Sequence, residues 1–499
     1  MLLLILMLVA YNWLILALDA DFLSILSATK SYVINFMLNL TIENIGIIKQ
    51  AKIALNGLTV IAGENDTGKS TVGKLMFAIV KALSRFEQDL NEDQKKQIRE
   101  TIESIYFQLR KSYSFQKYPA LKQAFHPDVF VEEVEKLLAH NHLKELNLLL
   151  AKKRQIWEQV QSETSLAEIV STESHHQTHG VEKINLEFEA LNHLITQKED
   201  KQSVIKRALS KALISEFHFE ITPKHAPWKS FLQIEEGMNH ILEIAIENNQ
   251  ITELEFYDEV FFNDVTFVET PILLQMYDIV NSASTLLEVI NEDNKSQRLE
   301  QLGKPKVSLH LKDLMSKLEN SQYFSLTFFE KDNFLVDFLK RIRQLSYGDF
   351  YFDNQLRDFI FKRTSHQEQI MSYRSVNTAS GLKSFGILQL LVESQFLDER
   401  SLLIIDEPET HLHPEWQVEY AKLIVMLAEN NIPVLLSSHS PYMIQALKVL
   451  CENSLLKNKA SYYLAAPTKD HLTEIVDVTD DLNQIFQTLS KPLQKLVWS

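Results

Sequence analysis

Residues Leu58 to Lys74 read LTVIAGENDTGKSTVGK, an apolar run followed by a loop between two glycines and the beginning of a helical pattern. Gly63 and Gly68 bracket four residues, and Lys69-Ser70 follow directly, which is the spacing of a phosphate-binding P-loop. The glycines let successive backbone N–H groups turn towards a phosphate, and the following helix adds the positive end of its dipole. The stretch therefore predicts a nucleotide site in an α/β fold.

The last residues of this loop have expected roles. Lys69 is placed to reach the β and γ phosphates of ATP, and Ser70 to ligate Mg²⁺. A chance glycine turn is the alternative, but the apolar run before the loop and the helical pattern after it favour the P-loop. The residues expected to contact the nucleotide are Gly63, Glu64, Asn65, Asp66, Thr67, Gly68, Lys69, Ser70 and Thr71.

The composition indicates a globular protein of two or three lobes, because 45% of its 499 residues are apolar. With 66 acidic and 50 basic residues the net charge is -16, so the whole molecule does not attract DNA or an anionic membrane. Contact with a nucleic acid would need a local basic patch or a partner. The single Cys451 excludes an internal disulfide framework and disfavours a thiolate zinc site, in keeping with a reducing cytoplasm.

The first 18 residues, MLLLILMLVAYNWLILAL, are nearly all apolar and are long enough for a marginal membrane span. No basic residue precedes Lys30, so the charged region of a secretory signal is missing. Met37 directly precedes the alternating pattern of an edge strand at Leu38–Ile42. We therefore expect residues 1–36 to be an extension upstream of the natural start and the protein not to be membrane-bound. A membrane anchor and a signal peptide are the alternatives.

A long segment after the P-loop has helical periodicity. It is rich in charge, and no proline occurs between Pro127 and Pro223. Val129–Val170 and Val181–Leu213 predict two antiparallel arms of roughly 50 to 60 Å, a short coiled-coil-like insertion. The arms would be joined by STESHHQTHG, whose three histidines are expected in a solvated loop, with a metal site as the alternative.

The remaining segments divide between strand and helix patterns. Two or three strands are expected at Leu38–Ile61, a hairpin at ILEIAIENNQITELEF, a strand at DVTFVETPILLQ and another hairpin at GDFYFDNQLRDFIFKR. The resulting segments are the extension 1–36, a P-loop segment 37–90, a helical insertion 91–225, strands 226–280, a second helical insertion 281–345, a second core segment 346–450 and a strand-helix tail 451–499.

Two further motifs each combine a buried strand with polar residues at its end. In SLLIIDEPETHLH, Asp406 is expected to hold Mg²⁺ from a strand beside the P-loop, and Glu407 to polarise the attacking water. In IPVLLSSHSP, His439 ends a neighbouring parallel strand, where it could reach the γ phosphate. Such a histidine is more often structural when it stands alone. Here the upstream P-loop favours the functional interpretation.

A third motif, ASGLKSFGILQLL, lies between the P-loop and the strand of Asp406. Ser380-Gly381 opens a helix, whose N-terminus offers a second anion-binding position. The alternative is an ordinary helix cap.

The segments GENDTGKS, NTASGLKS, LLIIDEPETHLHP and SSHSP, in this order, resemble the ABC-type ATPases of the SMC, RecF and OLD group. The resemblance covers residues 38 to about 450, strongly over the motifs and weakly over the insertions. It implies an α/β P-loop core with a mixed sheet interrupted by helical insertions, binding ATP and Mg²⁺. It also implies a homodimer or higher homo-oligomer that assembles through its ATP sites.

The same resemblance assigns roles to individual residues. Ser380, Gly381 and Lys383 belong to a signature loop that closes on the γ phosphate bound by another subunit. Glu407 is the general base and His439 the switch, while Gln275 occupies the place of the Q-loop residue at Mg²⁺. The commonest signature has Gly and Gln where this chain has Leu382 and Lys383, a departure that bears on the rate of hydrolysis more than on ATP binding.

The spacing of the motifs indicates which members of this group the chain resembles most. Ser70 and Ser380 are much further apart than in transporter ATPase subunits. OLD-type nucleases carry a Toprim domain after the switch histidine, whereas only 60 residues follow His439 here, with an acidic cluster at Asp477 and Asp480. The chain thus resembles the ATPase subunits of two-component anti-phage systems such as Septu, whose partner is a separate HNH nuclease.

Three functions remain in competition. The leading hypothesis is a cytoplasmic ATPase that controls a separately encoded nuclease, HNH-type or other, and contacts DNA only indirectly. The runner-up is a RecF-type DNA-maintenance protein that clamps DNA itself, against which the charge of -16 argues. A transport ATPase is the third, supported only by the apolar N-terminus.

Overall fold

The computed structural model describes residues 37–139, 142–168, 175–196, 200–224, 229–285, 305–321, 333–364 and 369–498. The chain divides into two compact units. Unit 1 contains the described residues up to Phe77, those from Glu220 to Thr285 and those from 305 onward, and unit 2 contains Ala78–Phe219. Residues 1–36, the expected extension, lie outside the described part. No helix in the described part is both long and apolar enough to cross a membrane.

Unit 1 is built on a mixed sheet of eleven strands, which confirms the α/β fold with a mixed sheet. The sheet order is β6-β5-β4-β1-β2-β16-β15-β3-β14-β13-β7. The strands β6, β5, β4, β1 and β2 pair antiparallel, and β16 is parallel to β2 but antiparallel to β15. The strands β15, β3, β14, β13 and β7 are parallel to one another. The strands are β1 (Leu38–Ile45), β2 (Ile48–Leu55), β3 (Leu58–Gly63), β4 (Ser230–Glu236), β5 (Asn239–Glu247), β6 (Gln250–Phe256), β7 (Asp264–Val268), β13 (Ser401–Asp406), β14 (Val434–Ser438), β15 (Ala460–Pro467) and β16 (Thr473–Asp477).

The position of β13 corrects one expectation. The strand that ends at Asp406 is not beside the P-loop strand, because β14 lies between β13 and β3. Leu436 of β14 pairs with Val60 on one side, and Leu435 pairs with Ile404 on the other. The apolar run of β13 indicated a buried strand, but all three strands are equally apolar and so leave their order open.

The expected strands near the N-terminus and both expected hairpins are present. The β5–β6 turn contains Asn248 and Asn249, both in the left-handed region at φ 51° and 63°, which suits a two-residue turn between twisted strands. The other hairpin joins β10 (Gly348–Asp353) and β11 (Asp358–Thr364), and β12 (Ile370–Arg374) extends it to a three-stranded sheet.

Helices with apolar faces complete the core of unit 1. The sequence predicts a helical stretch at 281–345; its described residues include α11 (Leu309–Glu319) and most of α12 (Asn333–Ser346), and a two-stranded sheet formed by β8 (Ser284–Thr285) and β9 (Lys306–Val307). The other helices are α8 (Tyr277–Ser282), α13 (Ser380–Glu393), α14 (Pro414–Glu429), α15 (Pro441–Glu452) and α16 (Asn483–Trp498).

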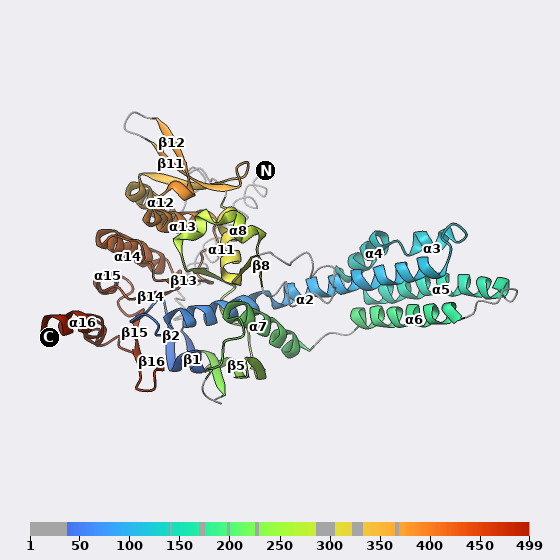
Figure 1. Ribbon diagram of the computed structural model, residues 1–499, viewed down its shortest axis with the longest axis horizontal. Coiled ribbons are helices and arrows are strands. Elements are labelled where there is room, and N and C mark those ends of the chain that lie inside the picture. The colour runs from blue at the N-terminus through green and yellow to red at the C-terminus, as the bar shows by residue number, and fades with distance from the viewer. Residues whose placement is uncertain are drawn as a thin grey trace, which may run out of the picture. The chain divides into compact units, whose positions relative to one another are not determined.

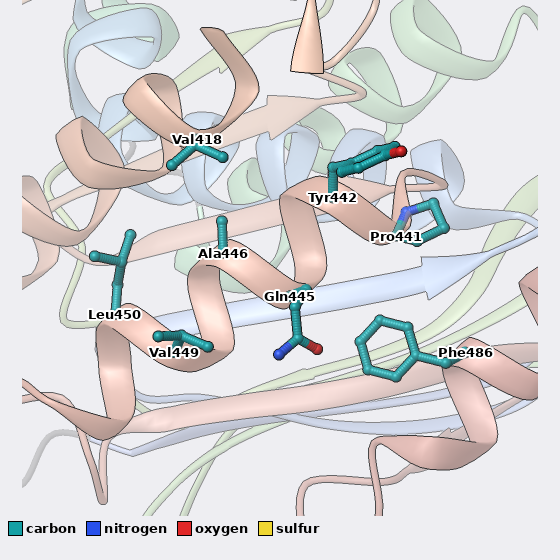
Figure 2. A pocket seen from close by; sticks show the side chains of 8 residues that line it. All are labelled: Val418, Pro441, Tyr442, Gln445, Ala446, Val449, Leu450 and Phe486. Atoms are coloured by element: carbon teal, nitrogen blue, oxygen red, sulfur yellow. The ribbon is translucent and has the colours of Figure 1, made fainter. Parts of the chain in front are cut away.

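An apolar hollow of about 570 Å³ lies on α14, α15 and α16. Figure 2 shows that Val418 comes from α14 and Phe486 from α16, while α15 supplies the other side chains. The α15 part begins at Pro441, two residues after His439. The hollow is lined by Val418, Pro441, Tyr442, Gln445, Ala446, Val449, Leu450 and Phe486.

Unit 2 is helical and has its own core. The helices α3 (Pro119–Ala124), α4 (Pro127–Ala139), α5 (Leu143–Glu168) and α6 (His175–Thr196) run alongside the C-terminal part of α2 (Lys69–Ser112), as Figure 1 shows. Trp157 is buried and stacks on Phe188, and Phe125 meets Phe188 edge-on. These large aromatic contacts are typical of a helical bundle rather than of a narrow coiled-coil seam.

The two antiparallel arms expected in this unit are each interrupted, although the long helices α5 and α6 flank the expected junction. Val129–Val170 is divided between α4 and α5, and Val181–Leu213 between α6 and α7 (Lys201–Phe217). A new helix begins at α7 because the Asp200 carboxylate accepts a hydrogen bond from the Ser203 N–H at 3.2 Å. In the expected loop between the arms, residues 171–174 lie outside the described part, and α6 begins at His175.

A glycine on α13 tests how closely this helix approaches the small sheet. A Cβ added to Gly386 would lie 2.4 Å from Cδ2 of Phe350 on β10. Gly386→Ala is expected to lower the melting temperature by about 3–6 °C, because overpacking costs about 1–3 kcal/mol and outweighs the gain in helix propensity. Phe350→Leu should recover part of this loss in the double variant. A melting temperature raised by Gly386→Ala would contradict the described packing.

Candidate functional site

The P-loop joins β3 to α2 through a backbone that only certain residues tolerate. Asp66 and Gly68 have positive φ of 59° and 76°, so the loop curls as a phosphate-binding nest requires. A Cβ at Gly63 would lie 2.8 Å from the carbonyl oxygen of Ala465. Glu64, Asn65 and Asp66 are exposed, whereas Thr67 is buried and its hydroxyl donates to the Glu64 carbonyl at 2.8 Å.

Lys69 is the buried cation of this loop, with 4% of its surface exposed. Its Nζ donates to the Glu64 carbonyl oxygen at 2.7 Å and lies 3.5 Å from Oε1 of Glu407. A buried ammonium needs such partners because its desolvation is costly. The Glu407 carboxylate thus holds the cation that phosphates of a nucleotide would otherwise contact.

Asp406 at the end of β13 faces the first turn of α2. Its carboxylate is hydrogen-bonded to the hydroxyls of Ser437 and Ser70. Burial raises the pKa of Asp406, the two hydroxyls oppose that rise, and the neighbouring charges of Glu407 and Glu269 add to it. A carboxylate and a hydroxyl are the hard oxygen donors that Mg²⁺ takes beside phosphates, and a divalent cation would relieve the cost of this buried charge, so these residues fit the ion.

Glu407 has an unusual backbone for a residue with a long side chain. Its φ is 45°, and its N–H donates to the Ser437 carbonyl oxygen at 3.1 Å and lies 3.2 Å from the Ser437 hydroxyl. The conformation turns the chain away from β13 directly after Asp406. Strained backbone held by neighbouring bonds is found at functional sites, where it aims a side chain.

His439 follows β14 and lies beside two carboxylates. Its Nδ1 is 3.3 Å from Oε1 of Glu407 and 3.2 Å from Oε1 of Glu409. The parallel strands β3, β14 and β13 therefore bring Lys69, Asp406, Glu407 and His439 to one edge of the sheet, where ligands bind in open α/β sheets.

The signature residues form the first turn of α13. Ala379, not Ser380, is the N-cap, and no side chain caps this terminus, so the interpretation of Ser380 as an ordinary cap is wrong. Gly381 is buried, and a Cβ there would be 3.0 Å from the Trp416 ring. Ser380 is half-buried.

Lys383 and Gln275 meet within one chain. The Lys383 Nζ donates to Oε1 of Gln275 at 2.5 Å, and burial lowers the pKa of Lys383. Gln275 ends a 3₁₀ helix, Pro271–Gln275, after β7. This arrangement engages the oxygen through which Gln275 would ligate Mg²⁺, so a direct role for Gln275 at the ion, and for Lys383 at the nucleotide, stays a prediction.

Several residues at this edge were not expected from the sequence. Glu269 directly follows β7, and its Oε2 lies 3.1 Å from Nε2 of the buried His310, while Oε1 is 3.8 Å from the Lys74 Nζ. The hydrogen bond with His310 is the largest cause of a lowered Glu269 pKa. The rule that pointed to Asp406, a carboxylate directly after a buried strand, applies equally to Glu269. Ser437 lies in IPVLLSSHSP and Glu409 in SLLIIDEPETHLH, but nothing in either motif indicates a role for these two residues.

Solved structures match most of the chain at low identity. The SMC head domain from Thermotoga maritima is 10% identical, covering 89% of this chain and 98% of its own, with a TM-score of 0.34. An SMC head domain with a coiled coil and joint from Pyrococcus yayanosii is 12% identical, covering 92% and 99%, with a TM-score of 0.33. An ATP-binding cassette of an ABC transporter, in its ADP conformation, is 9% identical, covering 93% and 98%, with a TM-score of 0.29.

A family assignment comes from the sequence itself. Among curated proteins none matches the chain. Residues 37–444 match the AAA ATPase domain family, a span that includes the P-loop, the signature segment, Asp406, Glu407 and His439. The chain belongs to the AAA ATPase domain family and is an ATPase.

Proposed function

We propose that this ATPase assembles with further copies of itself through shared ATP sites and controls a separate effector nuclease in anti-phage defence. The observation that carries the catalytic part is the meeting of Lys69, Ser70, Asp406, Glu407 and His439 at one edge of the sheet. Each of these residues has a chemically matched role in ATP hydrolysis.

In the proposed mechanism, the P-loop binds ATP before hydrolysis. Its N–H groups and Lys69 would hold the β and γ phosphates, while Ser70 and Asp406 would hold Mg²⁺. When bound, the ion neutralises charge on the phosphate oxygens. Lys69 then exchanges its contact with Glu407 for contacts with phosphate, which leaves Glu407 available to accept a proton from the attacking water.

Variants at Lys69 and Glu407 are expected to affect different steps, the first the binding of ATP and the second its hydrolysis. Lys69→Ala should weaken ATP affinity by about 100-fold or more, because a buried charge contact to phosphate is lost. Glu407→Gln should retain ATP binding and lower the hydrolysis rate by about 10²- to 10⁴-fold, because only the attacking water needs the base. Equilibrium binding of a fluorescent ATP analogue and steady-state phosphate release measure the two effects. Hydrolysis at the normal rate by Glu407→Gln would refute the assignment of the base.

The terminus of α13 supports sharing of sites between subunits. It has no side-chain cap, so its first N–H groups can bind an anion, and half-buried Ser380 stands at its first position. In the proposed assembly these groups contact the γ phosphate held by the P-loop of another copy. One subunit alone then has half of a site.

Two inactive variants should restore activity together if the sites are shared. Ser380→Arg should block assembly with ATP but leave the nucleotide affinity of the single subunit within about threefold, because Lys69 and the P-loop are intact. A mixture of Ser380→Arg and Lys69→Ala can form one complete site per dimer, and partial recovery of phosphate release is expected. Mixed oligomers without recovery would refute the shared site.

The separate nuclease is proposed from charge and from the role of the C-terminal segment. The net charge of -16 disfavours direct capture of DNA. After His439, β15 pairs with β3 and β16 pairs with β2, so these residues complete the ATPase sheet. Asp477 accepts a hydrogen bond from the Thr479 N–H at 2.9 Å, which gives this acidic cluster a structural role in a turn.

A cleavage assay separates the proposed effector from direct action on DNA. The purified chain is expected neither to cleave plasmid DNA nor to bind it with a steep dependence on salt. The same chain isolated from its native host with its bound proteins should cleave plasmid DNA in an ATP-dependent manner. Cleavage by the chain alone would contradict a separate nuclease, and tight salt-sensitive binding would favour the clamp of RecF type.

A further inference from the structure

Glu409 is a buried carboxylate that the proposed chemistry does not use. It lies two residues after Glu407, with 5% of its surface exposed. Its Oε1 accepts hydrogen bonds from the Ser438 hydroxyl at 2.8 Å, the His439 N–H at 2.7 Å and the Ser440 N–H at 3.1 Å. One carboxylate oxygen therefore fixes the backbone on which His439 is carried.

The second oxygen of Glu409 has no partner among the described residues. Glu409 Oε2 is buried without a hydrogen bond, and so is Nδ1 of His439. The His439 Nδ1 lies within 3.3 Å of Glu407 Oε1 and 3.2 Å of Glu409 Oε1, but it is aligned for a hydrogen bond with neither. An ionised carboxylate only accepts, so a hydrogen bond between the ring and either carboxylate requires the proton of His439 on Nδ1.

We propose that Glu409 is the positioning residue for His439. When a nucleotide takes the place of Glu407 at Lys69 and Glu407 turns to the attacking water, the Nδ1–H of His439 shifts from beside Oε1 of Glu409 and donates to its unpartnered Oε2. The ring is then held with Nε2 towards the terminal phosphate. No covalent bond changes in this step, and Glu409 acts only through His439. The inference rests on the proposed role of His439 in hydrolysis.

The surroundings of Glu409 favour a fixed orientation. The Ser440 hydroxyl donates to Oε1 of the buried Gln417 at 2.6 Å, and the Gln417 amide donates to the Leu412 carbonyl oxygen at 3.0 Å. These bonds tie the segment after β14 to the segment after β13. The side chain of His439 is nevertheless 39% exposed although its Nδ1 is buried, so the exposed part is the remainder of the ring.

A double-mutant cycle tests the proposal. Glu409→Gln keeps one oxygen for the three donors but replaces the other by an NH₂ group, which cannot accept from Nδ1–H. It should lower kcat for ATP hydrolysis by about 10- to 100-fold, the range for groups that orient a functional side chain from behind. The affinity for an ATP analogue should change by less than threefold. In a His439→Ala background the same substitution should have no further effect on kcat.

Two measurements accompany the cycle. Glu415→Gln makes the same chemical change on an exposed residue of α14 and is expected to leave kcat unchanged. Thermal unfolding identifies any variant that is misfolded. If Glu409→Gln is misfolded, Ser438→Ala removes one donor to the same carboxylate and should give a smaller loss, again only when His439 is present.

The outcomes separate this inference from the proposed function. If His439→Ala lowers kcat for ATP hydrolysis but Glu409→Gln leaves it unchanged, only the role of Glu409 is overturned. An effect of Glu409→Gln that persists fully in the His439→Ala background would overturn it as well, because Glu409 would then act independently of the ring. Normal hydrolysis by His439→Ala would overturn the proposed role of His439 itself, and this inference with it.

Discussion

The parallel alignment of β3, β14 and β13 is the constraint on which the rest of the site depends. Parallel strands end at the same edge, so β3 and the distant pair of β13 and β14 deliver the polar residues that follow them to one place. The sheet beneath that edge is apolar and buried, which keeps water away from the strands and makes the charges at their ends costly. That cost is met by pairing: Lys69 with Glu407, and Asp406 with two hydroxyls.

The sequence predicts the parts that depend on local patterns. The P-loop, the strands before Asp406 and Ser437, and the Asn248-Asn249 hairpin all have short signals with a clear physical cause, and the structure contains them. The order of strands could not be predicted in the same way, because three equally apolar runs do not specify which one lies in the middle. The helix breaks of unit 2 escaped prediction since a single cap at Asp200 carries little weight against a long helical pattern.

In the candidate site, too, the residues with a local sequence signal could be predicted and the contacts between distant segments could not. Residues named by their position at a strand end lie together at the sheet edge, whereas the contact between Lys383 and Gln275 joins positions 108 apart and has no sequence signal. Glu269 had the same signal as Asp406 but lacked a recognised motif around it. Glu409 was hidden for another reason, since its importance follows from burial and from three donors that only the folded chain assembles.

The contact between Lys69 and Glu407 has a further consequence for the proposed mechanism. A carboxylate that sits 3.5 Å from an ammonium is occupied by that contact, so it is not free to hold a passing water. In the proposed mechanism, Lys69 and Glu407 therefore keep each other engaged until a phosphate competes for Lys69. ATP binding would then be the event that releases Glu407 for the proposed chemistry, while the contact leaves the buried Lys69 cation paired in the structure described.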